Sequence, residues 1–240
     1  MDEQPYTLIL DDETTGLGDI ALRLLRLGID VFYANDPDEA VLFCSQEEAV
    51  TVRAVIFPET LDLAALGRVV PRLPVSSEGP GPSVVVMGDL ADEDRIFELR
   101  KAGVDRVLRP PFDDGTLRWI ANAARFENEH HPKRQHQRAP TSLLARASWG
   151  LKRKDLVCST LSVGGAFLET PSPLEVGARI KLKLPLPGGD LTLKSVVANH
   201  TDGAGELRTC GMGVTFLGPS EEERERLAAY VAQRTHEFLL

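Results

Sequence analysis

The chain has 240 residues, of which 42% are hydrophobic and 26% charged. This composition is typical of a globular protein with about two average domains, and no segment is apolar over the roughly 18 to 20 residues that a membrane span needs. The first residues are acidic where a secretory leader would be basic, so we expect a cytoplasmic protein. Cys44, Cys158 and Cys210 lack any CxxC spacing, which predicts free thiols.

The net charge of −9 is unevenly distributed along the chain. Residues 1–126 carry 12 Lys and Arg against 23 Asp and Glu, a net charge of −11, whereas residues 127–240 carry 15 against 13. The acidic front half argues against nucleic-acid binding, while the rear half is suited to a phosphate-bearing ligand.

In the first half, short apolar runs alternate with segments of helical periodicity. The runs at residues 6–10, 29–33, 53–57, 83–87 and 104–108 predict strands that are buried on both faces. Helices are expected over 17–27, after Asp36, from Asp92 to Gly103 and from about Asp113. This alternation predicts an α/β doubly wound parallel five-stranded sheet, in which a functional pocket lies at the carboxyl ends of the strands.

The residues at those strand ends resemble the response-regulator receiver family. Leu8-Ile9-Leu10-Asp11-Asp12-Glu13 is similar to the first strand of that family, and the segment 102–113 to its last strand and following turn. The resemblance implies an acidic pair that holds Mg²⁺, a phosphoacceptor Asp after the third strand, a Thr or Ser after the fourth, and a Lys after the fifth.

Three of these four parts are missing from the sequence. The acidic pair Asp11 and Asp12 is kept, but Pro58 occupies the phosphoacceptor position, Gly88 the hydroxyl position and Pro110 the lysine position. We therefore predict a pseudoreceiver that acts through protein contacts and not by phosphotransfer.

Glu59 follows Pro58 and would add a further carboxylate to this degenerate pocket. Successive side chains of a strand point to opposite faces, so Glu59, one residue beyond the acceptor position, is a poor substitute for the acceptor. The alternatives for the pocket are a cation such as Mg²⁺ at Asp11 and Asp12, carboxylates of raised pKa, a contribution from Arg109, or a solvated rim without a ligand. No other metal site is predicted.

Residues 127–140 are polar and contain two prolines, so they are expected to link domain 1–126 to domain 141–240. This linker contains the RxxxR sequence of Arg134 and Arg138, and Thr160-Leu161-Ser162-Val163-Gly164-Gly165 begins 22 residues beyond it. Together they resemble the PilZ family, whose pattern is RxxxR followed by (D/N)xSxxG.

The remainder of the second half is rich in short runs of strand-forming residues. These runs, at residues 142–148, 156–158, 166–168, 178–184, 191–199 and 211–216, predict a small antiparallel β-barrel. Ser220 and Glu223 form the signature of a capping box at the start of a C-terminal helix.

The PilZ resemblance implies cyclic di-GMP as the ligand. It assigns phosphate and guanine contacts to Arg134 and Arg138, because the planar guanidinium can donate to either group. Ser162 would offer a hydroxyl, and Gly165 would let the backbone approach the ligand. Thr160 departs from the family's Asp or Asn and should weaken the guanine contact by about 1 to 3 kcal/mol.

The sequence thus predicts a non-enzymatic bacterial signalling protein that binds cyclic di-GMP and passes the signal on by protein–protein contacts. Its resemblances suggest two-component signalling and motility, with signalling or motility proteins as partners. One alternative is a ligand-independent adaptor in which both domains are degenerate. Another is a response regulator that is phosphorylated at Glu59 or a neighbouring acid. No catalytic cofactor is expected.

Overall fold

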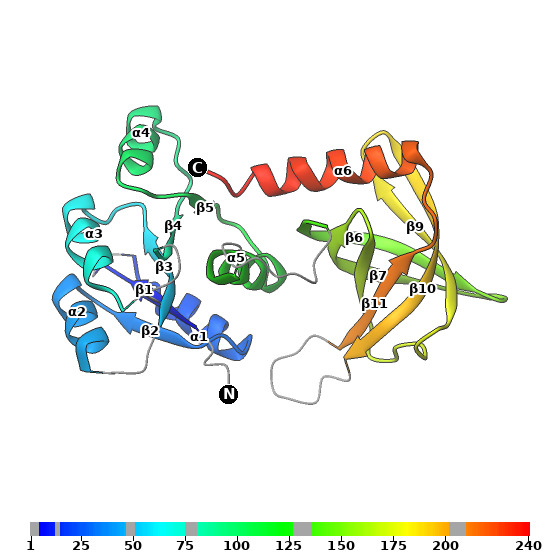
Figure 1. Cartoon of the computed structure of the whole chain (residues 1–240), viewed down its shortest axis with the longest axis horizontal. Coiled ribbons are helices and arrows are strands. Elements are labelled where there is room, and N and C mark those ends of the chain that lie inside the picture. The colour runs from blue at the N-terminus through cyan, green and yellow to red at the C-terminus, as the bar shows by residue number, and fades with distance from the viewer. Residues whose placement is uncertain (1–4, 13–14, 47–50, 75–80, 127–135, 202–209) are drawn as a thin grey trace. The chain divides into compact units, whose positions relative to one another are not determined.

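The computed structural model describes residues 5–12, 15–46, 51–74, 81–126, 136–201 and 210–240. The chain divides into two compact units (Figure 1). The first comprises Met1–His131 together with Phe238–Leu240, and the second comprises Pro132–Glu237. Among the helices of the described ranges, none is long and apolar enough to cross a membrane.

The first unit is a parallel five-stranded sheet with the strand order β2-β1-β3-β4-β5. Its elements are β1 (Tyr6–Leu10), α1 (Gly18–Arg26), β2 (Val31–Ala34), α2 (Pro37–Gln46), β3 (Val52–Pro58), α3 (Leu63–Val69), the 3₁₀ turn η1 (Val70–Arg72), β4 (Ser83–Met87), α4 (Glu93–Lys101), β5 (Arg106–Leu108) and α5 (Asp114–Phe126). The predicted doubly wound fold is confirmed.

Side chains of the central strands alternate between two hydrophobic layers. Ile9 and Ile56 pack in the layer that α1 and α5 cover, while Leu8, Leu10 and Phe57 pack in the layer of α2, α3 and α4. All of these side chains are fully buried. A strand that is covered on both faces needs apolar residues at successive positions, which explains the continuous apolar runs in the sequence.

Two strands begin later than the sequence predicts, and for the same reason. Ile29 and Val104 were both expected to start strands, but the N–H of Ile29 donates to the carbonyl of Leu24 and that of Val104 to the carbonyl of Leu99. Gly28 and Gly103, which precede them, have φ values of 71° and 84°. Each apolar residue therefore closes the preceding helix in a Schellman-type end, and β2 and β5 start two residues further on.

The second unit is a closed six-stranded barrel with the order β10-β11-β8-β7-β6-β9. Its elements are β6 (Arg138–Trp149), β7 (Lys152–Ser162), β8 (Gly165–Glu169), β9 (Arg179–Leu186), β10 (Gly189–Thr201), β11 (Gly211–Phe216) and α6 (Glu221–His236). The pairs within the barrel are antiparallel. Ser220 and Glu223 form the predicted capping box at the start of α6. The predicted barrel with a C-terminal helix is confirmed.

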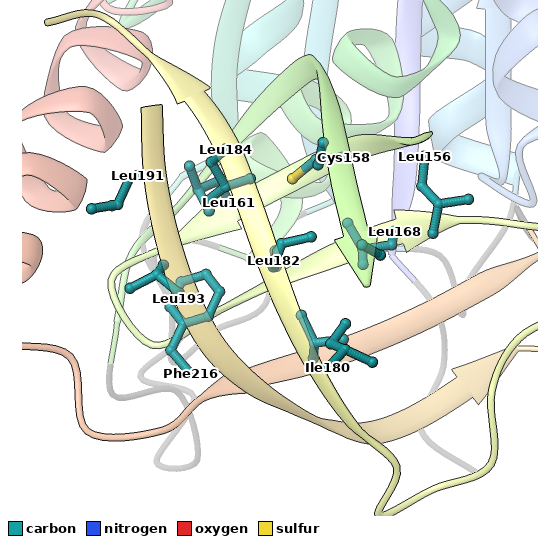
Figure 2. Close-up of a cluster of buried hydrophobic side chains, with 14 of the residues drawn as sticks. Leu156, Cys158, Leu161, Leu168, Ile180, Leu182, Leu184, Leu191, Leu193 and Phe216 are labelled. Carbon is teal, nitrogen blue, oxygen red and sulfur yellow. The ribbon is translucent and has the colours of Figure 1, made fainter. Parts of the chain in front are cut away.

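The barrel interior is filled by alternate residues of its strands (Figure 2). On β9, Ile180, Leu182 and Leu184 are buried while the residues between them are exposed, which is the period-two pattern of a strand with one face toward water. Cys158 lies in the same interior, and burial raises the pKa of its thiol to about 12. This cysteine therefore stays protonated and unreactive, whereas Cys210 is partly exposed.

The last three residues of the chain pack in the first unit. The N–H of Val107 donates to the carbonyl of Phe238 at 3.0 Å, and that of Leu240 to the carbonyl of Asp105 at 3.1 Å. Leu239 forms an antiparallel bridge with Arg106. The ring of Phe238 is buried against Trp119 of α5, with 5.0 Å between ring centroids. The C-terminal segment thus supplies both edge pairing and core packing to the parallel sheet.

Candidate functional site

The acidic pair at the end of β1 is bonded to neighbouring groups of its own unit. Asp11 is buried, and its carboxylate accepts hydrogen bonds from the N–H of Leu17 and the hydroxyl of Tyr33, both at 2.6 Å. The bond to Asp11 raises the pKa of Tyr33 to about 12. Asp12 accepts hydrogen bonds from the N–H of Thr15 and the hydroxyl of Thr60. The two carboxylates therefore hold the loops around them.

Glu59 follows β3, and its side chain lies over Gly88 at the end of β4. Its carboxylate accepts a hydrogen bond from the N–H of Leu90 at 3.0 Å, and a Cβ on Gly88 would lie 2.1 Å from the Glu59 Oε2 atom. Arg95 of α4 donates to the main-chain carbonyl of Glu59 at 2.8 Å. Because Gly88 has no side chain, the Glu59 carboxylate occupies the space that a hydroxyl-bearing side chain at position 88 would need.

The other two altered positions also lie at the carboxyl edge of the sheet. Pro58 is buried as the last residue of β3, where it pairs with Met87 of β4. Pro110 is exposed two residues after β5 and precedes a cis peptide bond to Pro111. Within the described ranges, no group of three or more His, Cys, Asp or Glu side chains is arranged to hold a metal ion.

The barrel register brings the two parts of the predicted nucleotide motif together. Arg138 begins β6 and pairs with Ser162 at the end of β7, and two residues further along β6 Pro140 pairs with Thr160. Arg138 was expected on a linker arm. It is instead the first residue of β6, because the pairing of β6 with β7 extends back through Pro140 to Arg138. The register of this pairing is irregular between Pro140 and Leu143, and a strand tolerates proline at such an irregularity. Arg134 lies outside the described residues.

A pocket of about 270 Å³ opens beside this pair of strands. Its lining comes from β6, β7, β8, β10 and β11 and consists of His136, Arg138, Thr160, Ser162, Gly164, Gly165, Ala166, Phe167, Ala198, Asn199, Gly213, Val214 and Thr215. Arg138 is the only one of these described lining residues with a permanent charge, and the lining has no carboxylate. The pocket is therefore suited to an anionic ligand.

One row of residues crosses the pocket from strand to strand. Thr160 of β7 pairs with Phe167 of β8, Phe167 pairs with Gly213 of β11, and Gly213 pairs with Asn199 of β10. Two strands, β8 and β11, separate Thr160 from Asn199 in this row. The pocket thus presents a polar side chain at each end and an aromatic ring between them.

Ser162 and Gly165 shape the turn between β7 and β8. The Ser162 hydroxyl donates to the carbonyl of Gly165 and accepts from its N–H, both at 3.1 Å. A Cβ on Gly165 would lie 2.2 Å from the carbonyl oxygen of Val214, so this glycine lets β8 approach β11. These two bonds stabilise the turn, and the hydroxyl oxygen has one further lone pair that could accept a hydrogen bond from a ligand.

Replacing Gly165 with alanine is expected to destabilise the barrel by about 1 to 3 kcal/mol, because the new methyl group overlaps a main-chain carbonyl that belongs to the sheet. Urea denaturation followed by circular dichroism would measure the change. Gly150→Ala is a less suitable comparison because its φ of 55° adds strain of its own. Gly81→Ala, at a position outside the helices and strands where a Cβ meets no atom within 4 Å, is a fair control.

His136 and Asn199 are pocket residues that the sequence did not single out. A Cβ on Gly164 would lie 2.6 Å from the imidazole of His136, and one on Gly213 would lie 2.4 Å from the Asn199 Oδ1 atom. The His136 side chain therefore packs against the backbone of Gly164, and the Asn199 side chain packs against that of Gly213. The only sequence signal for Asn199 was the Gly211-Met212-Gly213 segment, because a glycine within a strand often marks a position that a neighbouring group approaches closely. The signal does not indicate which residue that neighbour is.

Parts of the chain are similar to known proteins. Residues 132–233 match the family model of the PilZ domain, and no curated protein matches the chain. Similar solved structures include the motility inhibitor MotI/DgrA of Bacillus subtilis, with 18% identity, a TM-score of 0.38 and coverage of 43% of this chain and 51% of that one. The chain thus matches about half the length of the Bacillus protein.

Two further structures resemble one half of the chain each. The PilZ domain with c-di-GMP of YcgR from Escherichia coli has 18% identity and a TM-score of 0.36, and the match covers 44% of this chain and 93% of that one. A response regulator receiver protein from Burkholderia phymatum has 21% identity and a TM-score of 0.41, with coverage of 50% and 94%. Residues 132–233 are thus similar to the PilZ domain family, and in this chain they follow a domain with a doubly wound parallel five-stranded sheet.

Proposed function

We propose that the chain binds cyclic di-GMP in the pocket of its PilZ domain and transmits this signal through protein–protein contacts. The observation that carries the proposal is the strand register, which sets Arg138 opposite Ser162 within one pocket of a domain that is similar to the PilZ family. Arg134 completes the proposed ligand set from outside the described residues.

Arg138 would supply the main attraction for the ligand. Its guanidinium presents a planar fork of donors that matches either a phosphate or the O6 and N7 atoms of guanine. The described pocket lining contains no Asp or Glu side chain, which favours an anionic ligand. His136 and Phe167 add flat rings on which a base can stack.

Guanine selection would involve both ends of the row across the pocket. Thr160 offers one neutral hydroxyl to a base edge, whereas Asn199 offers an amide with both donor and acceptor atoms. Because two strands separate them in the row, each would contact a different part of a ligand that contains two guanines.

Titration calorimetry of the full chain with cyclic di-GMP tests the proposal directly. We expect binding by the wild type and at least about tenfold weaker binding by Arg138→Ala, since a hydrogen bond to a charged group contributes about 1.5 to 3 kcal/mol. Arg224→Ala is the matched control, because Arg224 is an exposed arginine of α6 that lies outside the pocket lining. The absence of any heat with the wild type would instead support the ligand-independent adaptor.

The receiver-like domain is proposed to act as a contact surface and not as an enzyme. Support comes from Pro58 in the acceptor position and from Glu59, whose carboxylate accepts the hydrogen bond of Leu90. Its excess of acidic residues gives it a surface for basic partner proteins. The cytoplasmic location and the domain boundaries predicted from the sequence stay predictions.

A further inference from the structure

The exterior of the barrel carries a concentration of basic side chains around β9. We name this surface the basic face, and it consists of Arg146, Arg153, Arg179, Lys181, Lys183 and Lys194. All six are exposed. On β9 the basic residues Arg179, Lys181 and Lys183 alternate with buried apolar ones, so they point outward together.

Strand register aligns part of the basic face in one row. Lys194 of β10 pairs with Lys181 of β9, Lys181 pairs with Ser148 of β6, and Ser148 pairs with Arg153 of β7. Like charges directly opposite each other destabilise a sheet. The juxtaposition of Lys181 and Lys194 therefore costs folding stability, and an anion bound at this row would relieve the repulsion.

Two carboxylates lie on the same surface, and each is already paired. Asp155 pairs with Arg146 at 2.7 Å, and Asp190 pairs with Lys183 at 2.5 Å. Within the described residues, Lys181 and Lys194 have no ion pair, and neither has Arg153. The excess of positive charge at the centre of the basic face is thus not neutralised by the described part of the chain.

The turn between β6 and β7 adds an apolar tip beside these charges. Leu151 at this turn is fully exposed, Trp149 is partly exposed, and Lys152 and Lys154 follow within the same hairpin. Figure 1 shows the end of this hairpin extending beyond the neighbouring strands of the barrel. An exposed leucine beside basic residues suits a surface that is anionic outside and apolar beneath, which is the chemistry of a phospholipid layer.

We propose that the basic face and Leu151 dock the PilZ domain on an anionic phospholipid surface. An acidic protein or a nucleic acid would satisfy the charges but would leave the apolar tip in water, so the lipid surface accounts for more of the observations.

The basic face is separate from the proposed nucleotide pocket. No residue of the basic face is among the described residues that line the pocket, and β9, at the centre of the basic face, contributes no residue to that lining. Lipid docking does not depend on the proposed nucleotide binding, and each can be tested without the other.

Sedimentation of the full chain with vesicles tests the proposal. The wild type is expected to bind vesicles of phosphatidylcholine mixed with phosphatidylglycerol and not vesicles of phosphatidylcholine alone. The double variant Lys181→Glu/Lys194→Glu should partition about 30-fold less, since each basic residue near an anionic surface contributes about 1 kcal/mol. Leu151→Ser should partition about tenfold less through lost burial of its side chain.

The matched control changes the same charge at a different place. Arg100→Glu/Lys101→Glu alters two exposed basic residues at the end of α4 and should leave partitioning within about twofold of the wild type. Circular dichroism melting would establish that each variant folds. The proposal is overturned by equal binding to both vesicle types or by an unchanged Lys181→Glu/Lys194→Glu variant. Oligonucleotide binding that this variant loses, without vesicle binding by the wild type, would assign the face to nucleic acid instead.

Discussion

Replacing Phe238 with alanine is expected to lower the free energy of unfolding of the first unit by about 3 kcal/mol. The ring is buried in the layer between the sheet and α5, where it packs against Trp119. Truncation removes the buried ring and leaves a cavity that the fixed strands around it cannot close. Phe238 should therefore contribute as much to the free energy of unfolding as a residue in the middle of the core, although it is the third residue from the end of the sequence.

Trp119 provides a signal for this measurement. The chain has two tryptophans, Trp119 in α5 and Trp149 in β6. In a Trp149→Phe background, urea denaturation followed by tryptophan fluorescence reports on the first unit alone. Phe238→Ala should shift the midpoint to lower urea concentration by the amount that corresponds to the lost free energy.

The neighbouring residue offers a matched control. Leu239 is about half exposed and takes part in the sheet through its main chain, so Leu239→Ala should leave the midpoint almost unchanged. Equal midpoints for Phe238→Ala and the parent would show that the C-terminal segment does not pack on the sheet in solution. Equal losses for both variants would show that the segment contributes by its length and not by the buried ring.

The contribution of Phe238 shows where sequence periodicity stops being informative. The apolar runs located β1, β4 and β11 to the residue, because each of these strands is bounded by turn-forming or charged residues. Phe238 instead follows a long helix of the other unit, and no local pattern indicates which sheet it joins. Helix α3 (Leu63–Val69) has only seven residues, which is too short for a helical repeat to predict its bounds.

The part of the candidate pocket that the RxxxR and (D/N)xSxxG pattern supplies was predictable from the sequence. Arg138, Thr160, Ser162 and Gly165 all line it, and the sequence named them together. Asn199 could not be named, because it reaches the pocket through the pairing of β10 with β11 and an irregularity in register just before it. Pairing between distant strands depends on the whole barrel and not on local residue patterns.

Two residues of the motif also have structural roles within the barrel. Gly165 was expected to let the backbone approach the ligand, and a side chain there would in addition meet the carbonyl of Val214 on the adjacent strand. Ser162 was expected to face the ligand, and its hydroxyl bonds twice to Gly165. A motif shared by a family can therefore reflect the needs of the barrel as much as those of a ligand.

Replacing Thr160 with aspartate is expected to strengthen cyclic di-GMP binding by about 5- to 150-fold, which corresponds to about 1 to 3 kcal/mol. The carboxylate would offer two acceptor oxygens to the N1 and N2 hydrogens of guanine, where the threonine hydroxyl offers one. Thr160 is partly exposed and pairs with Phe167 across the sheet, so the longer acid can extend into the pocket without displacing core residues. Titration calorimetry of both proteins under identical salt would measure the gain.

Two comparisons would separate a guanine contact from a general effect of charge. Thr160→Val keeps the shape of threonine and removes its hydroxyl, so it should bind no more tightly than the wild type. Cyclic di-AMP should gain nothing from Thr160→Asp, because adenine lacks the N1 and N2 hydrogens that the acid would accept. A gain for both nucleotides, or for neither, would show that position 160 does not contact the guanine edge.

Asn199 adds an independent test of how the ligand spans the pocket. If Thr160 and Asn199 contact different parts of the ligand, the effects of Thr160→Asp and Asn199→Ala should add within about 0.5 kcal/mol in the double variant. A strong coupling between them would mean that both side chains contact one base, and it would contradict this arrangement of the ligand. Additivity would therefore support a ligand that extends across β7, β8, β11 and β10, as a dinucleotide with two bases can.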